Sequence, residues 1–127
     1  MSLRVLMVND DLDTIEDFRR LLDALGHSIT VAHSATQGLA SMNATAHDIV
    51  LLSLDLRGIS GLDALPVLRH YHPAVLIIAL TAVLNPLRER QARSLGAFDV
   101  LLVPVEIDGL AAALDRAIEH RSRSAPP

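Results

Sequence analysis

Polar side chains follow several short apolar runs in this chain of 127 residues. In chain order, the most distinctive of them are Asn9, Asp10, Asp11, Ser53, Asp55 and Thr81. Carboxylate and amide oxygens are ligands for Mg²⁺, which favours a site with carboxylates. A serine hydroxyl becomes a nucleophile only where a base activates it, and Asp10 is the candidate base for Ser53. These residues indicate an acidic pocket that binds Mg²⁺ weakly, through Asp10, or not at all.

The composition excludes several kinds of chemistry. All 11 basic residues are arginine, and the chain has neither lysine nor cysteine, so no lysine ammonium, thiol or disulfide takes part. A formal net charge of −4 and an aromatic content of 2% argue against direct nucleic-acid binding. No glycine-rich phosphate loop and no Gly-x-Ser-x-Gly elbow occurs, which leaves nucleotide binding and hydrolysis without support. We expect no cofactor and no enzymatic activity.

The two ends of the chain and its longest apolar run bear on location. The first residues lack the basic and apolar regions of a signal peptide. The run 74–80 is far shorter than the roughly 20 residues of a membrane helix. We therefore expect a cytoplasmic protein with no membrane contact. Residues 122–127 are polar and end in proline, so we expect one domain over 1–121 followed by a linker or tail.

Five apolar runs alternate with five stretches of helical periodicity. The runs are Leu3–Val8, Ser28–Ala32, Asp48–Ser53, Val75–Leu80 and Phe98–Val103. Four of them are nearly continuous in Val, Ile and Leu, as in parallel strands buried on both faces, whereas the second alternates like an edge strand. Asp11, Ser34 and Asn85 are candidate caps of the first, second and fourth helical stretches, and the apolar stripes of the third and fifth begin at Leu62 and Ile107. Pro66 lies inside the third stretch, where we expect a kink or an irregular turn.

This alternation predicts an α/β fold with a doubly wound parallel sheet of five strands in the order 2-1-3-4-5. Five strand–helix units are too few for an eight-stranded barrel. Ligands bind such sheets at the carboxyl ends of the strands. Val103 and Pro104, at the end of the fifth strand, therefore join the polar residues as candidate site residues.

Five segments occur in the order and at the spacings of one known family. They are Val-Leu-Met-Val-Asn-Asp-Asp (5–11), Asp-Ile-Val-Leu-Leu-Ser (48–53), Gly-Ile-Ser-Gly-Leu (58–62), Leu-Thr-Ala (80–82), and Gly-Ala-Phe-Asp (96–99) followed by Val103-Pro104. On these segments, residues 3–121 resemble the receiver domain of two-component response regulators. The resemblance implies a flavodoxin-like (βα)5 fold, a role in phosphorelay signalling, and a cis peptide bond between Val103 and Pro104.

The chain departs from the family's pattern at the positions that carry its chemistry. The family's site has three carboxylates for Mg²⁺, one of them the phosphoacceptor Asp, and a lysine that pairs with the phosphoryl group. Here Ser53 stands at the acceptor position, Asn9 at the first acidic position and Val103 at the lysine position. Val100 replaces the aromatic switch residue, and Arg57 replaces a proline. The comparison implies a pseudo-receiver, because little remains to neutralise the charge of phosphoryl transfer.

The residues themselves leave alternatives open. Ser53 is either a replacement phosphoacceptor or a hydroxyl bonded to Asp10 or to backbone, and Asp55 is a displaced acceptor only if it reaches the site. Asp10 and Asp11 retain a metal site, cap the following helix, or do both. Thr81 is either the family's switch hydroxyl or a structural one.

The expected function is protein–protein signalling without conventional aspartyl phosphorylation. The resemblance places the contact surface on the fourth helix, fifth strand and fifth helix. Partners would be other signalling proteins, a C-terminal output domain or a second copy of the chain. The charged residues of this surface either serve such contacts or are ordinary solvated groups, and they are Arg88, Glu89, Arg90, Arg93, Asp99, Asp115 and Arg116. Two other functions stay open, which are an active phosphoreceiver that uses Ser53 and a flavodoxin-like cofactor-binding protein.

Overall fold

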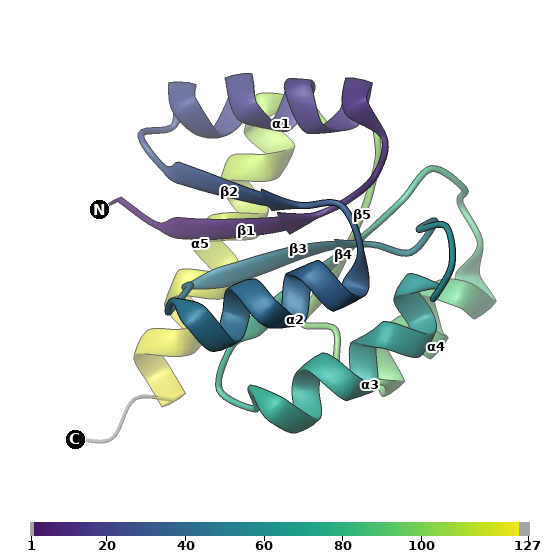
Figure 1. The fold of residues 1–127 in the computed structure, drawn as a ribbon. Helices are drawn as coiled ribbons and strands as arrows, with labels where there is room; N and C mark the ends of the chain where they lie inside the picture. Colours follow the sequence, from purple (N-terminus) through teal and green to yellow (C-terminus); the bar gives the residue numbers. More distant parts are fainter. Residues whose placement is uncertain (1, 125–127) are drawn as a thin grey trace.

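Five parallel strands alternate with five helices along the chain. The computed structural model describes residues 2–124 and is drawn in Figure 1. The strands are β1 (Arg4–Val8), β2 (Ser28–Ala32), β3 (Ile49–Ser53), β4 (Leu76–Thr81) and β5 (Asp99–Leu102). The helices are α1 (Leu12–Ala24), α2 (Ala35–Ala44), α3 (Gly61–Tyr71), α4 (Pro86–Ser94) and α5 (Ile107–Ser124). Among the described residues, no helix is both long and apolar enough to span a bilayer.

The strands form one sheet in the order β2-β1-β3-β4-β5, which confirms the predicted fold class and topology. Every neighbouring pair is parallel. Helices α1 and α5 cover one face of the sheet, and α2, α3 and α4 cover the other (Figure 1). The alternating run Ser28–Ala32 is an edge strand, as its pattern predicts.

Two apolar cores lie on the two faces of the sheet, and β3 supplies both. Ile49 and Leu51 pack in the core beneath α1 and α5, while Val50 and Leu52 pack in the core beneath α2, α3 and α4. All five residues of β3 are buried. Successive side chains of a strand point to opposite faces. A strand covered on both sides must therefore be apolar throughout, which explains the unbroken run that ends at Ser53.

Helices α1, α2 and α4 begin after the capping residues that the sequence indicates, and α1 and α4 are followed by glycines. Asn85 precedes Pro86 at the start of α4 and accepts hydrogen bonds from two amides of the first turn. Gly26 has a positive φ of 81° and follows α1. Pro66 lies inside α3, and its residue is exposed. Helix α5 extends to Ser124, so that residues 122–124, expected in a linker or tail, are helical, and 125–127 lie outside the described residues.

Helix α3 begins in direct contact with the end of β3. A Cβ atom added to Gly61 would lie 2.1 Å from the Ser53 carbonyl oxygen and 2.6 Å from the Leu54 Cα. No side chain fits in that space, because both neighbours are backbone atoms. Because residue 61 is glycine, the start of α3 can lie directly against the carboxyl end of β3, which closes the loop 54–60.

A buried carboxylate joins α4, β5 and α5. Asp99 is 8% exposed, and its two oxygens bind Arg93 at 3.1 Å and Arg116 at 2.7 Å. The Val100 amide donates a further hydrogen bond of 2.8 Å. Burial alone would raise the pKa of Asp99, but Arg116, the Val100 amide and Arg93 outweigh it and hold the pKa below 3.8. The charged form of Asp99 is thus favoured by folding.

We predict that Gly61→Ala destabilises the fold by about 1–3 kcal/mol, because the new methyl group must displace backbone at the end of β3. Chemical denaturation measures the change. Gly109→Ala is the matched control, since the added Cβ meets only the Val105 side chain, at 3.3 Å, within α5. The control should keep or raise stability, by up to about 1 kcal/mol. Equal effects of the two changes would contradict the close packing at Gly61.

We predict that Asp99→Asn lowers the free energy of unfolding at neutral pH by about 1–3 kcal/mol, because it removes charged hydrogen bonds from a buried site. The folded pKa lies below the unfolded value. This stabilisation is therefore present above about pH 4 and disappears as the pH falls through the folded pKa.

Denaturation of both proteins across pH 2–7 gives the test, and their stabilities should converge at the acid end. Glu119→Gln is the control, because the exposed pair of Glu119 with Arg123 contributes little. A difference between wild type and Asp99→Asn that stays constant with pH would argue against this linkage.

Candidate functional site

The parallel register brings the candidate residues to one edge of the sheet. Val8 is level with Leu52, and Ser53 is level with Leu80. The ladders continue one step beyond the strands, where the Asn9 amide donates to the Ala32 carbonyl and the Leu54 amide to the Leu80 carbonyl. The loops after β1, β3, β4 and β5 therefore leave the sheet side by side.

Three residues that follow β1 serve three different contacts. The buried Asn9 accepts the Asp11 amide at 3.0 Å. Asp11 caps α1 and accepts the Thr14 amide at 3.2 Å, so the capping alternative describes this residue. Asp10 reaches across the edge and accepts the Arg57 amide at 2.9 Å. Asp10 thus ties the loop after β1 to the loop after β3.

Ser53 lies at the end of β3 and is held by backbone. Its side chain belongs to the buried interior, with 6% of the residue exposed. The hydroxyl oxygen accepts a hydrogen bond of 3.1 Å from the Asp55 amide. Of the two partners expected for a structural Ser53 hydroxyl, Asp10 or backbone, the structure shows backbone. Among the described residues, the hydrogen bond found for this hydroxyl joins it to a backbone amide and not to Asp10, the candidate base.

The candidate residues at the end of β4, in β5 and after β5 make backbone hydrogen bonds or pack in the apolar cores. The Thr81 hydroxyl is buried and exchanges hydrogen bonds of 3.3 Å with the backbone of Val83. The Val103–Pro104 peptide bond is cis, as expected. Val103 packs against the core beneath α1 and α5, and Val100 packs against the core on the opposite face. Neither valine brings charge to the site.

A cation nevertheless reaches this edge, and it comes from α4. The guanidinium of Arg88 lies 2.7 Å from a carboxylate oxygen of Asp55 and donates a 2.8 Å hydrogen bond to the Leu54 carbonyl. It also approaches the Thr81 hydroxyl at 3.4 Å. From its sequence, Arg88 was expected only as a charge of the contact surface. The sequence feature that could have identified Arg88 as a site residue is its place in the first turn of the helix that follows the Thr81 turn.

Asp55 joins the site through both oxygens of its carboxylate. One oxygen faces Arg88, and the other accepts the Ala82 amide at 3.3 Å. The groups whose oxygen atoms could bind a metal ion here are the carboxylates of Asp10 and Asp55, the side-chain amide of Asn9 and the hydroxyl of Ser53. Asp10 already accepts a backbone amide, Asp55 already pairs with an arginine, and the Asn9 and Ser53 oxygens each accept a backbone amide. Mg²⁺ takes octahedral oxygen ligands and is usually held in proteins through one or two carboxylates. The residues present fit that ion poorly, because Asp10 and Asp55 are both already bound by donors of the protein.

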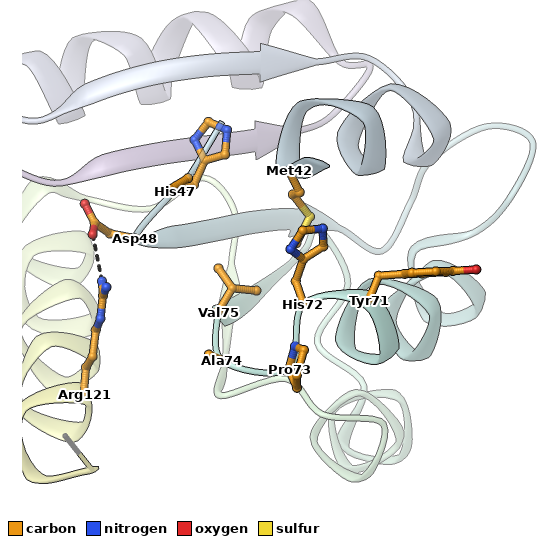
Figure 2. A pocket seen from close by; sticks show the side chains of 10 residues that line it. Met42, His47, Asp48, Tyr71, His72, Pro73, Ala74, Val75 and Arg121 are labelled. Carbon is orange, nitrogen blue, oxygen red and sulfur yellow. Dashed lines mark hydrogen bonds and ion pairs between the residues drawn. The ribbon is translucent and has the colours of Figure 1, made fainter. Parts of the chain in front are cut away.

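A hollow of about 310 Å³ lies at the opposite end of the sheet (Figure 2). The ion pair of Asp48 with Arg121 borders one side, and Tyr71 and His72 border the other. Burial lowers the pKa of His47, which also lines the hollow, although the nearby Ser41 carbonyl opposes this shift. His47 and Asp48 precede β3, Tyr71 and His72 lie at the end of α3 ahead of β4, and Arg121 lies in the last turns of α5. The hollow is therefore separate from the edge that carries Ser53.

Comparison with known proteins agrees with this geometry. The family model described as "Response regulator receiver domain" matches residues 5–115. The transcriptional regulatory protein ZraR of Escherichia coli K12 is 27% identical over 94% of this chain and 27% of its own length. The DNA-binding transcriptional regulator NtrC of Klebsiella pneumoniae is 31% identical over 95% of this chain and 26% of its own length.

Solved structures show the same likeness. NtrX of Brucella abortus matches with a TM-score of 0.90 and 27% identity, over 96% of this chain and 28% of NtrX. A CheY-like receiver domain protein of Methanospirillum hungatei has a TM-score of 0.90 and 19% identity, over 98% of this chain and all of its own, and so supports the fold alone. The chain spans about a quarter of the curated relatives that it matches. The chain belongs to the response regulator receiver domain family, and it is a signalling module of the two-component type.

Proposed function

We propose that this receiver domain acts in the cytoplasm by contact with other proteins, without conventional aspartyl phosphorylation. The observation that carries the proposal is Ser53, a buried hydroxyl held by the Asp55 amide at the end of β3. The family's acceptor at this position is a carboxylate. A neutral hydroxyl without a base does not attack a phosphodonor at a useful rate.

The electrostatics of the edge supports the same proposal. Phosphoryl transfer depends on positive charge that neutralises the transferring group. Arg88 is a cation of this edge, and Asp55 already pairs with it. Asp10 is a further carboxylate of the edge and accepts a hydrogen bond from the Arg57 amide. Both carboxylates are therefore already bound by groups of the protein, which weakens any metal site, and Arg88 is not free to neutralise a phosphoryl group.

The partner surface that we propose is formed by α4, β5 and α5. Exposed apolar side chains lie on these elements and at their ends, and they are Leu87, Leu95, Leu102 and Ile107. By contrast, Arg93 and Arg116 are engaged by Asp99 within the chain. Contacts on this surface would therefore bury apolar area. A second copy of the chain is one partner, and a C-terminal output domain is another, because ZraR and NtrC are much longer regulators.

The phosphorylation part of the proposal is tested by thermal unfolding with Mg²⁺ and beryllofluoride, and by mass spectrometry after incubation with acetyl phosphate. We expect no shift in Tm and no phosphoryl adduct on the wild-type chain. Ser53→Asp is the informative variant, because it restores a carboxylate at the acceptor position and is expected to respond more than wild type.

Two outcomes would contradict this part. Stabilisation of the wild-type chain by Mg²⁺ together with beryllofluoride would show a competent site. A phosphoryl group mapped to Ser53 would instead establish the chain as a phosphoreceiver that uses serine.

The surface is tested by sedimentation of the chain over a range of concentrations. We expect a reversible dimer that Leu102→Glu weakens at least tenfold, because a carboxylate would be buried where apolar area was. Val67→Glu on α3 is the matched control, since Val67 and Leu102 are equally exposed, at 46%. A monomer at every concentration, or equal effects of both variants, would rule out a homodimer through this surface.

A further inference from the structure

Two hollows meet at the amino end of the sheet. The hollow shown in Figure 2 is one of them, and a second, of about 400 Å³, lies beside it. The ion pair of Asp48 with Arg121 lines both. The second hollow, which we call the α5 hollow, is also lined by Leu3, Ile49, Leu76, Ala117 and Ile118. Its volume falls in the range of small-molecule sites, roughly 300–1,000 Å³.

The floor of the α5 hollow is apolar. Leu3, Ile49 and Ala117 are buried members of the core beneath α1 and α5, and Leu76 and Ile118 pack against that core. These residues come from the beginnings of β3 and β4, from the residue before β1, and from α5. An apolar group that enters the hollow extends the core and leaves water, which favours binding.

Asp48 and Arg121 differ in how far their hydrogen-bonding capacity is used. One Asp48 oxygen accepts Arg121 at 2.8 Å, and the other accepts the Arg4 amide at 2.7 Å. A guanidinium has five N–H donors, and within residues 2–124 the structure gives Arg121 one acceptor, which is Asp48. The Arg121 side chain is also 54% exposed, against 27% for Asp48. Arg121 can therefore bind a second acceptor without releasing Asp48.

Positive charge exceeds negative charge around this ion pair. Burial alone would raise the pKa of Asp48, but the Arg4 amide, Arg121 and the charge of Arg4 hold it below 3.8. Asp48 is therefore ionised at neutral pH, and two guanidinium groups act on its one carboxylate. Glu119, the acidic residue nearest to Arg121 along α5, pairs with Arg123 instead. The surplus charge favours an anionic ligand, although the chain as a whole has a net charge of −4.

We propose that the α5 hollow binds a small monocarboxylate with an apolar chain, such as a medium-chain fatty acid. The chain of the ligand lies on the apolar floor, and its carboxylate accepts the remaining donors of Arg121. Charge-assisted bonds from a guanidinium to a carboxylate are among the stronger hydrogen bonds in proteins. The inference goes beyond the proposed function and does not depend on it, because this hollow and Ser53 lie at opposite ends of the sheet.

Other classes of ligand fit the α5 hollow less well. A cation would have to displace a donor, because both oxygens of Asp48 are already bound. Inorganic phosphate has no apolar part and would leave the floor in contact with water. An alcohol with an apolar chain would cover the floor but would leave the surplus charge uncompensated. The floor and Arg121 together therefore select a chain with a singly charged head.

The test is a titration with octanoate, below its micelle-forming concentration, followed by NMR through the backbone amides of residues 117–121. On the wild-type chain we expect saturable shifts at these amides. Octanol lacks the charge of octanoate, and acetate lacks its chain. Each should bind at least about tenfold more weakly than octanoate, which corresponds to the loss of one charged hydrogen bond or of the chain's apolar contacts.

Arg121→Gln should weaken the binding of octanoate by at least about tenfold, because the charged donors are lost. Arg123→Gln is the matched control. It removes the same charge from an exposed position at the same end of α5, and it should bind octanoate as wild type does. Thermal unfolding checks that both variants fold. If Arg121→Gln does not fold, the comparison of octanoate with octanol on the wild-type chain decides instead.

The absence of a saturable shift with octanoate on the wild-type chain would overturn the proposal. Equal affinities for octanoate and octanol, or equal effects of the two variants, would overturn it as well. Shifts confined to α4 and β5 would also contradict it, because octanoate would then bind the proposed partner surface. Phosphorylation is read separately by mass, so the outcome at Ser53 leaves this titration interpretable.

Discussion

The pairing of β3 with β1 and β4, buried on both faces, is the constraint on which this domain depends. It divides the apolar side chains into two cores and places the ends of the strands at one edge. Gly61 then brings α3 against the backbone of Ser53 and Leu54. Because the ladder fixes the backbone, the residues beyond the strand ends can change without loss of the fold. The edge is thus an ordered frame on which different side chains can be placed.

Charge at this edge is balanced by a route that differs from the family's pattern. A chain without lysine and with Val103 before Pro104 brings no cation from β5. Arg88 supplies one from α4, and the Asp55 carboxylate compensates it. The hydrogen bonds of a guanidinium are strongest where it binds a carboxylate in a fixed geometry. The ion pair therefore links β3 to α4 across the edge.

The strands and their order are predictable from the sequence, because strands buried on both faces must be continuously apolar and parallel strands require crossover helices. Ser53, Asn9 and Thr81 were placed at the edge by the same logic. Arg88 was not predicted at the site. A helical residue reaches the site only if its helix begins next to the site and if the residue lies on the helix face that points toward it. The end of α5 shows a related limit, because polar residues can continue a helix, and here they carry α5 to Ser124, beyond the boundary expected at residue 121.

The polar residues of the edge keep a structural use that requires no phosphorylation. Backbone amides need acceptors, from the protein or from water. Asn9, Asp10 and Ser53 accept the amides of Asp11, Arg57 and Asp55, one each. Oxygens that could bind a metal ion thus hold the loops after β1 and β3. Apolar replacements at these three positions would remove the acceptors that orient the two loops.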